Sequence, residues 1–166
     1  MKHMKSVLFA ALAFAIVFGA IAFPSAAQAK AKNCQTIAEI AAGDPNFSTL
    51  VAALSAAGLV DTLNGKGKFT VFAPTNDAFA KLPEGTVENL LGDIPALTNV
   101  LLYHVARGER MAVSVVNASQ LRMLNKQFAP VSEMDGSYYI ANAKIVATDI
   151  KACNGVIHVI EDVMLP

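Results

Sequence analysis

The sequence contains little charge. Of its 166 residues, 16% are Asp, Glu, Lys or Arg and 54% are hydrophobic, which argues against disorder and allows a substantial core. Thirteen basic side chains balance thirteen acidic ones. Loss of Lys2 and Lys5 with the leader described below leaves eleven positive and thirteen negative residues, a net charge of −2. This balance argues against binding to nucleic acid and against electrostatic docking on anionic lipid.

The motifs of several enzyme classes are missing. The chain has no G-x-x-x-x-G-K-[ST], no G-x-G-x-x-G, no G-x-S-x-G and no C-x-x-C, so the usual signatures of phosphate, dinucleotide, hydrolase and thioredoxin-type sites are absent. We expect no catalytic residue, no metal and no cofactor. Two alternatives stay open without support from spacing: a metal site of His104, His158 and the cysteines, and a catalytic set that includes Asp149.

The first 29 residues have the pattern of a cleavable secretory signal. Lys2 and Lys5 give a positive start, an uncharged apolar run extends from Val7 to Phe23, and Ala27-Gln28-Ala29 is a small-x-small cleavage site before Lys30. The alternative is an uncleaved membrane anchor, for which the run is short. We therefore expect an exported protein of the periplasm, the cell surface or the medium, with no permanent membrane insertion.

Only two cysteines are present, Cys34 and Cys153. In an exported protein such a pair is usually oxidised. We expect a disulfide that joins the start of the mature chain to the turn before its last strand. The alternative is two free thiols.

Helical patterns come early in the chain and strand patterns come late. Thr36-x-x-Glu39 is a capping box, and Asp44-Pro45 is typical of a helix start. Gly and Asn turn signals separate the later segments. This segregation favours an α+β fold over alternating βαβ units. The strands that we expect are Phe69–Phe72, Tyr103–Ala106, Ser119–Met123, Phe128–Glu133, Ser137–Ile140, Lys144–Ile150 and Val156–Ile160.

Three stretches together resemble the fasciclin domain family. They are Phe69-Thr70-Val71-Phe72-Ala73-Pro74-Thr75-Asn76-Asp77-Ala78-Phe79, then Tyr103-His104-Val105, then the run from Asn154 to Pro166. The resemblance implies an α+β wedge of twisted β-structure with several α-helices packed around it. It covers nearly the whole mature chain. The organisation that we expect is a signal at 1–29, a short N-terminal segment at 30–35 and a single domain at 36–166.

The family resemblance also implies a function. Fasciclin domains act in adhesion, so we expect a monomeric, non-catalytic module that binds protein or glycan partners at a cell surface or in a matrix. The alternative is a periplasmic or surface protein that binds a small ligand, a metal or a cofactor. By similarity to animal members of the family, the partner-binding candidates are Tyr103, His104, Asp149 and Ile150. For all four a structural role is the alternative, and for His104 this means a buried, hydrogen-bonded imidazole.

Other residues of the matching stretches are expected to be structural. His158 lies between apolar residues, so we expect a buried, neutral imidazole that is hydrogen-bonded to a group in the 69–79 stretch. Thr75 or Asn76 should cap the helix that follows that stretch. The full structural set is Thr75, Asn76, Asn154, Gly155 and His158.

Overall fold

The structure is a computed structural model that describes residues 34–166. The expected signal at 1–29 lies outside the described residues, as does most of the segment 30–35. Eight helical elements are present in the described part: α1 (Ile37–Gly43), η1 (Pro45–Phe47, a 3₁₀ turn), α2 (Ser48–Ala56), α3 (Val60–Asn64), α4 (Asn76–Ala80), α5 (Thr86–Gly92), α6 (Ile94–Tyr103) and α7 (Ala112–Val116).

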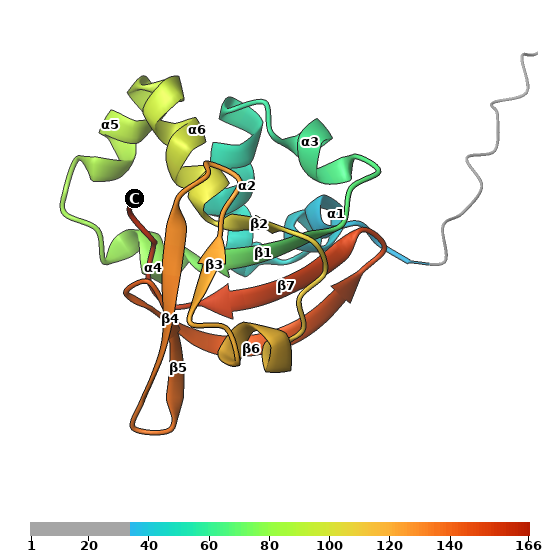
Figure 1. Cartoon of the computed structure of the whole chain (residues 1–166). Helices are drawn as coiled ribbons and strands as arrows, with labels where there is room; N and C mark the ends of the chain where they lie inside the picture. The colour runs from blue at the N-terminus through green and yellow to red at the C-terminus, as the bar shows by residue number, and fades with distance from the viewer. Residues whose placement is uncertain (1–33) are drawn as a thin grey trace, which may run out of the picture. The chain divides into compact units, whose positions relative to one another are not determined.

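Seven strands form one strongly curved sheet (Figure 1). Their order is β2-β1-β7-β6-β5-β4-β3, and only the β1–β7 pair is parallel. The two end strands, β2 and β3, meet through a bridge between Ala106 and Met123. The sheet is therefore nearly a barrel, and the fold is α+β as the sequence predicts. The strands are β1 (Phe69–Pro74), β2 (Val105–Arg107), β3 (Gln120–Arg122), β4 (Phe128–Met134), β5 (Ser137–Ile140), β6 (Ala143–Ala152) and β7 (Gly155–Ile160).

Strands β1 and β7 are buried on both faces. On one face Val71 and Ile157 belong to a cluster with the apolar residues of α1, α2, α3 and α6. On the other face Phe72 and Ile160 join a second cluster with β3, β4, β5, β6 and α7. Helices α1, α2, α3 and α6 thus cover one side of the central pair, while the outer strands curl around the other side together with α7 (Figure 1).

The predicted helix caps are present. The Thr36 side chain accepts a hydrogen bond from the Glu39 N–H, and the Glu39 carboxylate accepts one from the Thr36 N–H, which completes the capping box. Thr75 caps α4 by accepting from the Ala78 N–H. Asn76 instead ties α4 to the helices before it, because its amide donates to the Pro45 carbonyl at 2.9 Å and its oxygen accepts from α2. Thr75 is therefore the helix cap, and Asn76 connects α4 to the preceding helices.

Asn154 and Gly155 connect the last strand to the first elements of the domain. The Asn154 side chain accepts from the Ile37 N–H at 2.9 Å and donates to the Leu63 carbonyl, so it joins α1 to α3. Gly155 has φ +151°, and a Cβ added there would lie 1.8 Å from the Phe69 carbonyl oxygen. Only glycine fits at this close approach of β7 to β1.

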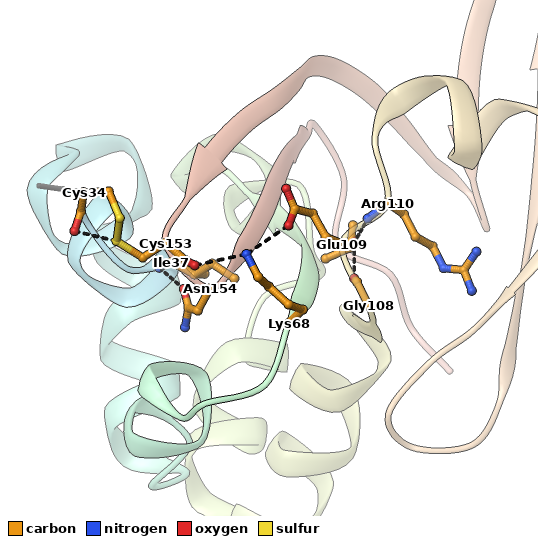
Figure 2. Close-up of polar contacts among 9 residues, drawn as sticks. Cys34, Ile37, Lys68, Gly108, Glu109, Arg110, Cys153 and Asn154 are labelled. Atoms are coloured by element: carbon orange, nitrogen blue, oxygen red, sulfur yellow. Dashed lines mark hydrogen bonds and ion pairs between the residues drawn. A yellow bond between two sulfur atoms is a disulfide. The ribbon is translucent and has the colours of Figure 1, made fainter. Parts of the chain in front are cut away.

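The predicted disulfide is present. Cys34 and Cys153 are bonded, their Cα atoms are 5.5 Å apart, and 119 residues separate them in sequence. The Cys153 N–H also donates to the Gln35 carbonyl at 2.8 Å. Figure 2 shows the bridge next to Ile37 and Asn154, where α1 meets the β6–β7 turn. The bond thus fastens the first described residues to the end of the sheet.

One prediction of local structure is wrong, and one helix was not predicted. Tyr103 is the last residue of α6, and His104 follows it as the C-cap, so the strand β2 begins only at Val105. The apolar end of α6 continues directly into a buried strand with no break in the sequence pattern, so the sequence predicts the start of the strand too early. The second difference is α7 at Ala112–Val116, which no helix signal in the sequence predicted.

Candidate functional site

Tyr103 and His104 are buried at the end of α6. They are 6% and 2% exposed. The Tyr103 hydroxyl donates to the Phe128 carbonyl at 3.4 Å. His104 Nδ1–H donates to the Val100 carbonyl at 2.8 Å, and Nε2 accepts from the Met164 N–H at 3.0 Å. Desolvation lowers the pKa of His104 to about 4, against a smaller opposing effect of the Val100 hydrogen bond. The imidazole is therefore neutral and joins α6 to the last residues of the chain.

Asp149 and Ile150 lie where β6 changes its register against β7. Asp149 has a positive φ of 62°. Its Oδ1 accepts from the Ala112 N–H at 2.7 Å, so the carboxylate holds the first residue of α7. Ile150 is half-buried and packs against the helix-side core. These contacts give Asp149 a structural role, and its hydrogen-bond partners Ala112 and His158 line a surface hollow.

His158 is fully buried in β7. Its Nε2–H donates to the Arg110 carbonyl at 2.8 Å, and its Nδ1 accepts from the Asp149 N–H at 3.3 Å. The expected burial is thus confirmed, whereas the expected hydrogen bond to the 69–79 stretch is wrong. That stretch instead supplies Phe72, whose ring stacks on the imidazole with centroids 5.4 Å apart. Desolvation lowers the pKa of His158, while the Arg110 carbonyl and the nearby Asp149 charge oppose that shift.

The structure brings Asp149 and His158 together but leaves Tyr103 and His104 at a different place. Within residues 34–166, no hydrogen bond joins Tyr103 or His104 to Asp149 or Ile150. Direct contact with a partner requires exposed atoms, which the buried Tyr103–His104 pair does not offer. A contribution of this pair to binding would act through the position of α6 and β2.

An apolar hollow of about 300 Å³ lies next to Asp149, because the adjacent Thr148 and the hydrogen-bonded Ala112 and His158 line it. Val113, on α7, is 69% exposed at this hollow, and Tyr138, on β5, is 36% exposed. The sequence does not predict this site, because it carries no helix signal for α7, and β5 and β6 reach the hollow only through the fold. We call the set of lining residues the α7 face: Ala112, Val113, Val115, Val116, Tyr138, Ile145, Thr148 and His158.

Metal-binding clusters and membrane-spanning helices are absent from the described residues. Across residues 34–166, no three His, Cys, Asp or Glu side chains come together as a metal-binding group. None of the helices in that part of the chain is both long and apolar enough to cross a bilayer.

Comparison with known proteins gives consistent matches. A family model described as "Fasciclin domain" matches residues 45–166. Protein sll1483 of Synechocystis sp. is 45% identical over 141 residues, which are 84% of this chain and 78% of that protein. Transforming growth factor-beta-induced protein ig-h3 of Sus scrofa is 41% identical over 133 residues, or 79% of this chain and 19% of that protein.

A solved structure supports the same fold. It is a FAS1 domain pair from the insect cell adhesion molecule Fasciclin I, with a TM-score of 0.65 and 20% identity. The match covers 80% of this chain and 51% of the other chain.

Proposed function

The chain belongs to the fasciclin domain family, and from this membership we propose that it is a non-catalytic adhesion or interaction module of the cell exterior that binds protein or glycan partners. The family match supports the general role. The leader pattern of residues 1–29 supports export. The domain would act as a monomer and without a cofactor.

One observation supports the α7 face as the binding surface. Its exposed apolar side chains lie next to the Asp149 carboxylate, which is held in place by the Ala112 N–H. Val113 is the most exposed large hydrophobic residue of the described chain. Isolated exposed apolar residues are ordinary, but a hollow with an apolar lining and an exposed aromatic ring is typical of an interaction site. Asp149, next to it, offers a charged group for a basic partner.

The four family-derived candidates take different parts in this proposal. Asp149 and Ile150 shape the α7 face, since they fix the start of α7 and the bend of β6. Tyr103 and His104 support binding indirectly, because both are buried. Substitution of either buried residue would therefore lower stability as well as binding.

The test compares two exposed valines. Val113→Ser changes the α7 face, whereas Val146→Ser changes a valine that is 49% exposed but does not line the hollow. Beads coated with each purified variant are assayed for adhesion to cells of the source organism, and thermal melts are recorded in parallel. Loss of adhesion in Val113→Ser alone, at unchanged melting temperature, supports the proposal. Equal adhesion of both variants and the wild type means that another face binds.

A second candidate function is binding of a small apolar ligand in the same hollow. Its volume of about 300 Å³ is at the lower end of the range for small-molecule sites. Native mass spectrometry of the protein purified from its source would detect a bound molecule. A ligand lost in Val113→Ser and retained in Val146→Ser would favour this function over adhesion.

A further inference from the structure

All three arginines of the sequence line one cavity. Arg107, Arg110 and Arg122 are the only arginines among the 166 residues. Together with Lys126 they surround a hollow of about 450 Å³, which Met123 and Leu124 also line. We call this hollow the arginine cavity. It is separate from the α7 face, because the two have no lining residue in common.

The closure of the sheet assembles this cavity. Arg107 ends β2 and Arg122 ends β3, and these strands are the two ends of the sheet order. The Ala106–Met123 bridge and a hydrogen bond from the Leu124 N–H to the Val105 carbonyl, 2.8 Å long, bring the strand ends together. Cations that are up to 19 positions apart in sequence thereby face one hollow.

The loop that carries Arg110 is held by two fully buried side chains. The Arg110 N–H donates to the Thr70 hydroxyl oxygen at 2.8 Å, and the Arg110 carbonyl accepts from His158 Nε2–H at 2.8 Å. Thr70 in turn donates to the Gly108 carbonyl at 2.8 Å. Because the backbone is fixed on both sides of the residue, little backbone entropy remains to be lost when the guanidinium binds a ligand.

No carboxylate in the described chain neutralises the arginine cavity. The ion pairs within residues 34–166 are made by Lys68 and Lys81 only. Glu109, between two of the arginines in sequence, pairs with Lys68 at 3.0 Å. Figure 2 shows the Glu109 side chain directed to Lys68 and the Arg110 side chain directed away from that pair. Four unpaired cations around a concave surface concentrate positive potential there.

We propose that the arginine cavity binds an acidic glycan, a sugar chain that carries carboxylates. This inference rests on the proposed function only in assuming that the domain works by binding a partner. Guanidinium groups match carboxylates in a bidentate geometry. Phe128 pairs with Arg122 across β3 and β4, so the two side chains share a face, and the Phe128 ring is 54% exposed. That ring offers an apolar surface for a sugar beside the charged groups.

Two other polyanions fit the cavity less well. An acidic peptide strand has no open sheet edge to join here, because β2 and β3 are bridged to each other. Nucleic acid carries its charges much closer together than an acidic glycan does, and its affinity for a protein depends on many phosphate contacts. Residues 34–166 carry nine Lys and Arg against thirteen Asp and Glu, so repulsion would grow along such a polymer.

The experiment is a calorimetric titration of the purified, oxidised domain with an oligogalacturonate. The matched ligand is the same oligomer with its carboxyls methyl-esterified. The matched proteins are the double variants Arg107→Gln/Arg122→Gln and Lys66→Gln/Lys151→Gln, which lose equal charge inside and outside the cavity. We expect the acidic oligomer to bind and the ester not to bind. The arginine variant should bind about tenfold or more weakly than the wild type, and the lysine variant within about twofold of it.

Several outcomes would overturn the proposal. If the ester binds as tightly as the acidic oligomer, the cavity does not recognise carboxylates. If the lysine variant weakens binding as much as the arginine variant, the cavity is not the binding site. Free galacturonate that binds as tightly as the oligomer would indicate a small-acid site. Tighter binding of oligoglutamate, with the same dependence on arginine, would mean that the ligand is a protein and not a glycan. Tighter binding of oligothymidylate, with that dependence, would mean that the ligand is a nucleic acid. If no oligomer binds while Val113-dependent adhesion persists, this inference fails and the proposed function stands.

Discussion

Acidification is expected to destabilise the protein through His104. The neutral ring uses both nitrogens, because Nδ1–H donates to the Val100 carbonyl and Nε2 accepts from the Met164 N–H. A proton on Nε2 would face that N–H and remove the hydrogen bond. The charge would also be buried, since the side chain has almost no contact with solvent. The folded state therefore resists protonation of His104, whereas the unfolded chain does not.

The sign and size of the effect follow from the pKa. The pKa of His104 is lowered from 6.5 to about 4. Between these two values the unfolded state holds more protons than the folded state, so stability falls as the pH falls, and the change ends below about pH 4. At ~1.4 kcal/mol per pKa unit, the loss is roughly 3 kcal/mol. This is a large part of the ~5–15 kcal/mol that stabilises a typical domain.

Urea unfolding of the wild type and of His104→Gln, at several values between about pH 7 and about pH 4, measures this loss. Carboxylates titrate in both proteins, so their contribution cancels in the difference. The variant should be less stable at neutral pH and should show a flatter dependence on pH. It keeps a residual slope of the same sign from His158, whose pKa is also lowered. Parallel curves for the two proteins would refute the reasoning.

Two further predictions concern the covalent and backbone closure of the domain. Reduction of the Cys34–Cys153 bond, which spans 119 residues, should lower the free energy of unfolding by up to ~4–5 kcal/mol, as measured by urea melts with and without reductant. Equal midpoints would contradict this. Gly155→Ala should cost at least ~3 kcal/mol or abolish folding, because its Cβ would overlap the Phe69 carbonyl. Gly136→Ala, at φ +71° with nothing within 4 Å, is the control and should cost only ~1 kcal/mol; equal melts of the two would disprove the argument.

Elements with local signals were predictable from the sequence. The capping box at Thr36 and Glu39 needs only the first turn of α1, and it is present. The strand Ser137–Ile140 lies between two turns, and its bounds are as predicted. The resemblance of the signature stretches to the fasciclin family supplied the rest of the fold class, because short strands by themselves do not specify how a sheet is ordered.

Features that depend on distant contacts were not predictable. Helix α7 contains three valines in five residues, and β-branched residues favour strands. The N–H of its first residue donates a hydrogen bond to Asp149, 37 positions away, so the local sequence contains no capping residue that would indicate the helix. The arginine cavity was missed for the same reason. A net charge near zero gives no sign of a local cluster of cations, but the closure of β2 on β3 gathers the arginines in one place.

The parallel pairing of β1 with β7 also determines the order in which this chain can fold. Phe69 lies beside Gly155, and the pairing continues to Pro74 and Ile160, so the contacts that fill the centre of both cores have very high sequence separation. Closing so long a loop is entropically costly before any contact is gained, and chains of high contact order fold slowly. Until residues 155–160 arrive, β1 lacks one of its two neighbours and Phe72 lacks its stacking partner. The domain is therefore expected to remain open during synthesis until its last strand is available, and then to close in a single late step.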